Sequence, residues 1–148
     1  MPGIHDYTLQ KHKKNVLHSE RRIAETAVAD GNVVMLGSAD WMVVPATANA
    51  QALGVALNTV TTEQIAEWVA GGDIAAVEVE VAMIGVVPVI ASESIDADDF
   101  VIPNTGGQVQ NAAGNGLDNI IGKMLKDTDT DEEGHMLIVY CGSTRGQT

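Results

Sequence analysis

The chain has 148 residues, of which 45% are hydrophobic but only 3% aromatic, and it carries a net charge of −12. This length predicts one domain with a modest core of aliphatic side chains. The single cysteine, Cys141, excludes an internal disulfide or a multi-cysteine metal site, and within MLIVYC we expect it to be a small buried hydrophobe. So acidic a body would repel phosphates, which argues against direct nucleic-acid binding.

The charge is divided unevenly along the chain. Residues 1–22 hold two acids against five basic residues, a net of +3, so −15 remains for the rest; the basic residues are Lys11, Lys13, Lys14, Arg21 and Arg22. We interpret 1–22 as a basic N-terminal arm, extended or partly helical, and 23–148 as the body. The N-terminus lacks a secretion signal and the apolar run 81–92 is too short to span a bilayer, so we expect a soluble protein made in the cytoplasm.

From Ile23 onward, short β-type runs alternate with turns. The first runs are VVMLG, WMVVPA and ALGVAL, at 33–37, 41–46 and 52–57. Asp30-Gly31 is a strong turn dipeptide, and Pro45 indicates an edge or the end of a strand.

One segment, 59–72, predicts a helix. Thr61 stands three residues before Gln64 as a capping box, and Gly71-Gly72 ends the segment. Ile65, Trp68 and Val69 form an apolar stripe, and Trp68 is expected to anchor the helix on the sheet.

The segment AAVEVEVAMIG, 75–85, predicts the clearest strand. Val77, Val79 and Val81 point one way, while Glu78 and Glu80 point to a solvent face rather than forming a catalytic pair. VVPVIA follows, where Pro88 indicates an edge, bulge or rim. The chain continues with DADDFVIPN, a glycine-rich β loop, DNIIGKMLK, the turn TDTDEEG and the strand HMLIVYCG.

A short apolar motif around a glycine, ALGVALN at 52–58, is repeated as DNIIGKMLK at 118–126. Gly54 to Gly122 is 68 positions, and so are Asp30 to Asp98, Val33 to Val101 and Leu57 to Leu125. This constant displacement indicates one supersecondary unit used twice, although chance could also produce it. The sequence therefore predicts a mainly β fold: a small β-barrel or β-sandwich, possibly of two related halves, with one short helix and an extended N-terminal arm.

The candidate catalytic and metal-binding residues do not match the spacing of known motifs. Asp127, Asp129 and Asp131 begin like a calcium loop, but its sixth and twelfth positions hold Glu132 and Ile138. A solvated hairpin turn is the better interpretation, with weak cation binding left open. The histidines of the arm match no ligand spacing, and His135, the only histidine of the body, belongs to no nucleophile motif. We predict no enzyme, no cofactor and no metal site.

The order of elements resembles the capsid decoration, or cement, proteins of tailed viruses of bacteria and archaea. The resemblance rests on VADGNVV, ALGVAL, VEVEVAMIGVVPV, IIGKML and LIVYCG, and covers roughly residues 23–142. The helix and the long arm do not match the family pattern. The resemblance implies a trimer on the outer capsid surface of the virion that clamps neighbouring major capsid subunits.

The arm is the expected partner-binding segment, because only a partner surface could offset its ordering entropy. It would contact the capsid or a neighbouring subunit through its five basic residues and through Tyr7, Leu9, Val16 and Leu17. Two alternatives stay open: a turret or tail component of the virion, and a small ligand-binding β-barrel with a pocket lined by Trp41 or Trp68.

Overall fold

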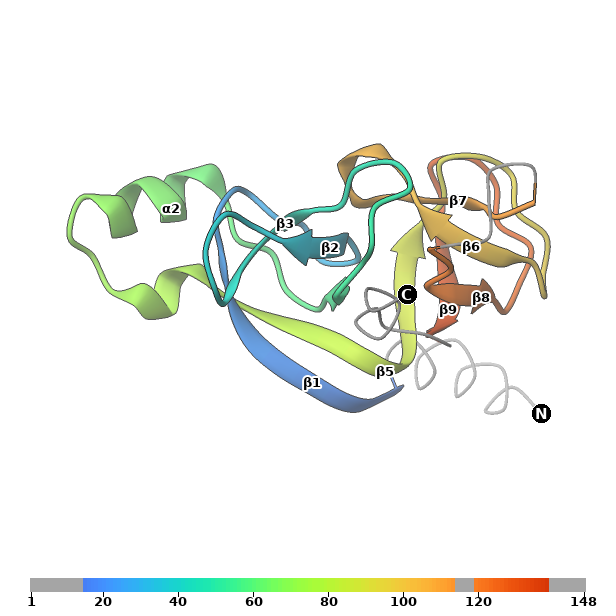
Figure 1. Cartoon of the computed structure of the whole chain (residues 1–148), viewed down its shortest axis with the longest axis horizontal. Helices are drawn as coiled ribbons and strands as arrows, with labels where there is room; N and C mark the ends of the chain where they lie inside the picture. Colours follow the sequence, from blue (N-terminus) through green and yellow to red (C-terminus); the bar gives the residue numbers. More distant parts are fainter. Residues whose placement is uncertain (1–14, 114–118, 139–148) are drawn as a thin grey trace, which may run out of the picture.

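The computed structural model describes residues 15–113 and 119–138 and is built mainly from β-strands (Figure 1). The strands are β1 (Asn15–Ala24), β2 (Val33–Leu36), β3 (Met42–Pro45), β4 (Gly54–Ala56), β5 (Glu78–Ile90), β6 (Phe100–Pro103), β7 (Val109–Asn111), β8 (Gly122–Met124) and β9 (Glu133–Ile138). One α-helix, α2 (Thr62–Val69), and two 3₁₀ turns, η1 (Ile74–Val77) and η2 (Thr105–Gly107), complete the described elements. The predicted mainly β fold with one short helix is confirmed.

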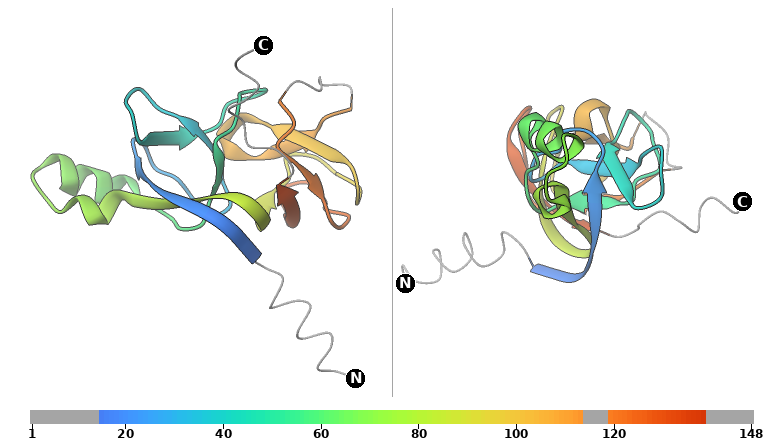
Figure 2. Two further views of the ribbon diagram at one scale, coloured as in Figure 1. Left: turned by 60° about the horizontal axis from the view of Figure 1, so that its bottom comes forward. Right: turned by 90° about the vertical axis from the view of Figure 1, so that its left-hand side faces the viewer.

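The described strands form one sheet in the order β1-β3-β2-β4-β5-β9-β8-β6-β7, and β1 also pairs with β5. The extra pairing closes β1, β3, β2, β4 and β5 into a ring. At the other end of the sheet, an isolated parallel bridge joins Ala91, directly after β5, to Val109 of β7. This bridge closes β5, β9, β8, β6 and β7 into a second ring. The long strand β5 therefore belongs to both rings, and the two lie side by side along it (Figures 1 and 2).

The two rings repeat one unit. The hairpin β2–β3 corresponds to β6–β7, and β4 pairs antiparallel with β2 as β8 does with β6. Gly54 lies opposite Val34, and Gly122 lies opposite Val101, in the same place of each half. The predicted pair of related halves is thus present in the structure.

Three acidic turns, before β2, β6 and β9, share one geometry. In each, the fourth residue's N–H donates to the first residue's carbonyl, at 2.9 to 3.2 Å, and its side chain accepts from the first residue's N–H. The third residue is left-handed: Gly31 (φ 95°), Asp98 (φ 74°) and Asp131 (φ 64°). Gly31, not Asp30, is therefore equivalent to Asp98, a displacement of 67 positions, so the constant displacement of 68 is wrong by one residue in this block.

The two repeated glycines are required by close approach of the neighbouring strand. A Cβ atom on Gly54 would overlap the carbonyl oxygen of Ala82 in β5 and lie 2.7 Å from Val81 Cγ1. A Cβ atom on Gly122 would lie 2.7 Å from the carbonyl oxygen of Leu137 in β9. Each half thus needs a residue without a side chain where its third strand crosses its fourth.

Helix α2 is an insertion in the first half. Thr61 Oγ1 accepts from Gln64 N at 3.2 Å and Gln64 Oε1 from Thr61 N at 2.8 Å, which confirms the predicted capping box. The equivalent turn of the second half uses Asp129 and Glu132 without forming a helix. No residue of α2 is fully buried, but Ile65 and Trp68 pack against the core of the first half. The helix projects from the end of the sheet away from β6 to β9 (Figure 2).

Alternation along β5 follows the prediction, because Val79 and Val81 are fully buried while Glu78 and Glu80 are not. One core cluster includes residues of both rings, among them Val33, Val87 and Met136, and a second lies within the first ring. Shared packing of this kind makes the two halves one cooperative body.

The end of the predicted arm lies in the sheet. Residues 15–22 form most of β1 and pair antiparallel with β5 from Asn15↔Val86 to Arg22↔Val79. Apolar alternation is missing here because Glu20 and Arg22, which lie opposite the buried Val81 and Val79, are charged. The sequence therefore shows no strand pattern before Ile23.

Candidate interaction surfaces

Of the predicted partner-binding residues, four lie in β1. Val16 is partly buried against the core, and Leu17 is 78% exposed at a bulge between β1 and β5. Arg21 and Arg22 alternate to opposite faces of the strand. The other predicted residues, Tyr7, Leu9, Lys11, Lys13 and Lys14, lie outside the described residues.

Arg21 contacts β5 of its own chain. Its guanidinium lies 3.7 Å from the carboxylates of both Glu78 and Glu80, and Ser19 Oγ donates to Glu80. The two glutamates predicted to lie on a solvent face thus form an ion pair network with β1. Because the side chain of Arg21 is largely exposed, this network contributes little to stability.

Arg22 is held more tightly, since its side chain is only 14% exposed. Its Nη2 donates to Glu20 Oε1 at 2.7 Å, and its guanidinium lies 4.6 Å from the centroid of the Trp41 ring. This hydrogen bond is the largest cause that lowers the pKa of Glu20. Desolvation by burial acts in the opposite direction, and the charges of Arg22 and His18 lower the pKa further. The Nε of Arg22 is buried without a hydrogen-bond partner among the described residues.

The loop from β2 to β3 forms one wall of a hollow beside Arg22. Ser38 donates to Glu25 from both its backbone N–H, at 2.7 Å, and its hydroxyl, at 2.9 Å, and these bonds lower the pKa of Glu25. The loop closes through Gly37 N to Met42 O at 2.8 Å. Trp41 is left-handed at φ 69°, a conformation rare for a bulky residue, and its side chain is 58% exposed.

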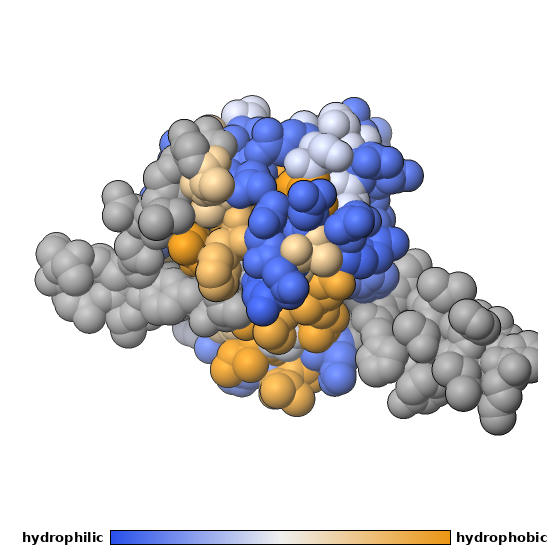
Figure 3. All heavy atoms as spheres, turned by 90° about the vertical axis from the view of Figure 1, so that its right-hand side faces the viewer, coloured by the Kyte–Doolittle hydropathy of each residue, from blue (hydrophilic) through white to orange (hydrophobic). Residues whose placement is uncertain are grey.

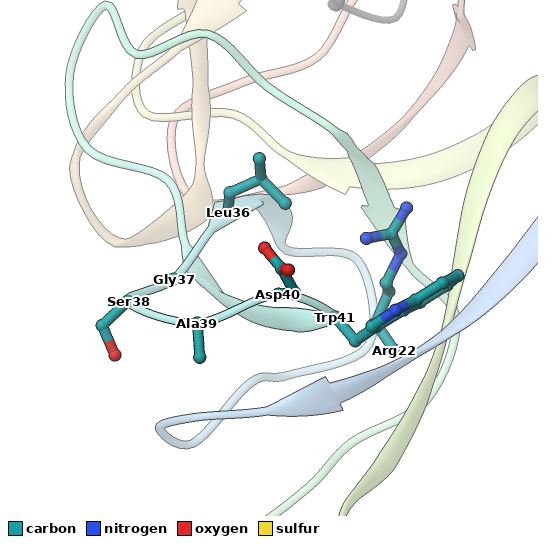
Figure 4. Close-up of a pocket in the computed structure, with 7 residues that line it drawn as sticks. All are labelled: Arg22, Leu36, Gly37, Ser38, Ala39, Asp40 and Trp41. Atoms are coloured by element: carbon teal, nitrogen blue, oxygen red, sulfur yellow. The ribbon is translucent and has the colours of Figure 1, made fainter.

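The hollow has a volume of about 330 Å³ and is lined by Arg22 together with residues 36–41. Figure 4 shows the side chains of Leu36 and Asp40 pointing to one side of the loop, where the side chain of Arg22 reaches in from β1 and lies beside the Trp41 ring. Ser38 and Ala39 point the other way. The open alternative of a pocket lined by Trp41 therefore has a physical counterpart, whereas Trp68 packs on the core.

Exposed apolar residues lie around Lys123 on the outside of the second ring. Val86, Leu137, Lys123 and Phe100 follow one another across β5, β9, β8 and β6, since each pairs directly with the next. Phe100 is 47% exposed, and Leu125 and Leu137 are also exposed. We call Phe100, Leu125 and Leu137 the end face. Figure 3 views this end and shows apolar surface gathered on its lower part, with polar residues above.

The acids of the loop before β9 serve the fold. Asp127 accepts from Ala97 N at 2.9 Å, Asp129 from Ser94 Oγ at 3.2 Å and Asp131 from Gln108 Nε2 at 3.3 Å. Residues 15–113 and 119–138 contain no cluster of three or more His, Cys, Asp or Glu side chains suited to a metal ion. In the same part of the chain, no helix is long and apolar enough to cross a membrane.

The described residues thus form a two-ring β fold that presents the exposed end face and the hollow beside Arg22. The sequence matches no protein-family model and no curated protein. A solved structure, the head fiber gp8.5 N base of bacteriophage phi29, is similar in fold, with a TM-score of 0.62 and 16% identity. The similarity covers 85% of this chain and 97% of that one, so the fold is shared over most of this chain and nearly all of the other.

Proposed function

We propose that this chain is a virion structural protein that decorates the outer surface of a capsid shell. The observation that carries the proposal is the fold shared with a phage head fiber base over 85% of this chain. A fold alone does not define a function, so the surfaces of this chain must supply the attachment.

The end face is the proposed docking surface for the major capsid protein. Exposed apolar residues are common singly, but a contiguous group on a rigid sheet is typical of an interface. Phe100 supplies the aromatic anchor that dominates many interfaces, and Leu137 lies on the other side of Lys123 from it. Leu125, two residues after Lys123, is also exposed. Lys123 lies between Leu137 and Phe100, and its ion pair with Asp98, at 3.4 Å, would set orientation more than affinity.

The basic arm adds a second attachment in the proposal. Lys11, Lys13 and Lys14 precede β1, which fixes where the arm leaves the body. Its positive charge complements an acidic shell surface or the acidic body of a neighbouring copy. We propose a trimer, because three arms acting together bind far more tightly than one and would clamp adjacent capsid subunits.

Co-sedimentation with mature capsids of the encoding virus tests the docking surface. We expect Leu137→Asp to weaken binding by about 10-fold or more, because a charge would be buried at an apolar contact. Val69→Asp is the matched control, since Val69 is 75% exposed on α2 at the opposite end. Equal loss in both variants, or recovery of the protein only with tails, would overturn the proposal.

The arm and the trimer have their own tests. A chain lacking residues 1–14 keeps the whole of β1 and should remain folded while binding capsids more weakly, with the deficit largest at low salt. Light scattering on the purified full chain measures its mass. A monomer at every concentration would remove the trimer from the proposal while leaving the docking surface intact.

A further inference from the structure

The hollow beside Trp41 carries an inference independent of capsid attachment. Trp41 is a large aromatic residue that the fold leaves 58% exposed, and its backbone is left-handed, as bulky residues rarely are. The loop that imposes this conformation is tied down by the two hydrogen bonds from Ser38 to Glu25. Strain held in place by its surroundings is typical of binding sites.

The polar groups of the hollow leave bonding capacity for a ligand. Arg22 is the donor, since its guanidinium has five N–H groups and the structure gives it one hydrogen bond, to Glu20. Asp40 is the acceptor, since its carboxylate has no hydrogen bond or ion pair within residues 15–113 and 119–138 and rises on the same side as Arg22 (Figure 4). Leu36 and Trp41 supply apolar surface around this pair.

The charge balance decides the class of ligand. Arg22 and Asp40 place one positive and one negative group in the hollow, with Glu20 2.7 Å from Arg22, and the whole chain carries −12. An anionic ligand would be repelled by Asp40 and by the net charge of the chain, and a cation would meet the guanidinium of Arg22. A neutral polyol avoids both costs, because its hydroxyls can donate to Asp40 and accept from Arg22.

Size and shape narrow the class further. A volume of about 330 Å³ lies at the lower end of the range for ligand pockets, which suits a single sugar ring with its substituents. The C–H face of such a ring can pack on an aromatic side chain, and although the guanidinium of Arg22 covers part of the Trp41 ring at 4.6 Å, Trp41 remains 58% exposed. We propose that this hollow binds a neutral carbohydrate, with the sugar ring against Trp41 and its hydroxyls shared between Asp40 and Arg22.

The test is a titration of the ¹⁵N-labelled full chain with glucose, galactose, mannose and chitotriose, and with glucuronate as the anionic probe. We expect at least one neutral saccharide to shift the indole N–H signal of Trp41 at about 20 mM or less, and to bind about 10-fold more tightly than glucuronate. The indole signal of Trp68, on the core, serves as the internal control.

Two variants separate binding from folding. Trp41→Asn removes the ring but suits the left-handed backbone, so it should lower affinity by about 10-fold or more with no fall in melting temperature. Asp40→Asn should lower affinity by about fivefold, because a neutral amide is a weaker acceptor than a carboxylate. Trp68→Phe should bind like the parent chain.

Three outcomes would overturn the inference. These are no shift of Trp41 with any neutral saccharide, tighter binding of glucuronate than of the neutral sugars, or sugar binding that survives Trp41→Asn. A Trp41→Asn variant that loses capsid binding in the co-sedimentation assay but keeps its sugar response would instead make this hollow a protein contact, and would likewise refute the carbohydrate site.

Discussion

Replacing Gly54 by alanine tests the close approach that explains the repeated glycine. The added methyl group would overlap the carbonyl oxygen of Ala82 and press on Val81 Cγ1 at 2.7 Å. One obstacle is backbone and the other is a β-branched side chain, so neither can rotate away and β4 must separate from β5.

The structure allows the cost to be ranked against two other glycines. Overpacking costs about 1–3 kcal/mol, and Gly54→Ala should reach the upper end of that range. Alanine recovers about 1 kcal/mol of backbone entropy, which leaves a net loss of about 2 kcal/mol. Gly122→Ala should cost less, because two of its three nearest atoms belong to the flexible side chain of Met136. Gly71→Ala meets open space, and its cost of about 1 kcal/mol comes from φ 107° alone.

Urea unfolding followed by circular dichroism measures these differences. With an m-value of about 1.5 kcal/mol per molar, Gly54→Ala should lower the midpoint by about 1.3 M and the other two variants by about 0.7 M or less. A Gly54→Ala midpoint equal to or above that of Gly71→Ala would refute the steric account of the repeat.

Three further predictions concern the helix, the loop and the core. Thr61→Ala should cost about 1 kcal/mol by urea unfolding, because it removes the acceptor for Gln64 N–H, and Thr61→Ser should restore it. The folded state lowers the pKa of Glu25 below about 4.5, so its bonds to Ser38 stabilise the loop fully above that pH and are lost as the pH falls through the folded value. Tryptophan fluorescence in a Trp68→Phe background should show this acid transition and lose it with Glu25→Gln; an unchanged titration would contradict the assignment. Met136→Ala should cost about 2–5 kcal/mol, since the side chain is fully buried, and a loss below about 1 kcal/mol would show that the core collapses around it.

The sequence predicted those elements that depend on residues close to one another in the chain. The capping box at Thr61 and Gln64 marks the start of α2, and the alternation of Val79 and Val81 with two glutamates marks β5. The repeat predicted two related halves from glycine spacing. It missed the one-residue shift, because a left-handed position accepts either Gly31 or Asp98 and the letters alone align Asp30 with Asp98.

The strand β1 was hidden because its inward positions carry charge. Glu20 and Arg22 neutralise each other opposite buried valines, an arrangement that depends on β5, which is more than fifty residues away in sequence. Trp41 was noted as a possible pocket residue, but its left-handed backbone and its contact with Arg22 arise from the loop and from β1 together. Asp40, Ser38 and Glu25 carry no motif, so no sequence signal could have grouped them.

The membership of β5 in both rings has a mechanical consequence. A load applied between the helical end and the opposite end of the molecule would be carried in part along β5, whose ladders to β1 and β9 run nearly its whole length, and in part by the core and the loop hydrogen bonds that also join the two halves. Pulling along a strand strains many of its hydrogen bonds at once, whereas peeling at an edge breaks them singly. We therefore expect the shared strand to bear tension along its length, so that the molecule resists end-to-end pulling better than its free energy of unfolding alone suggests.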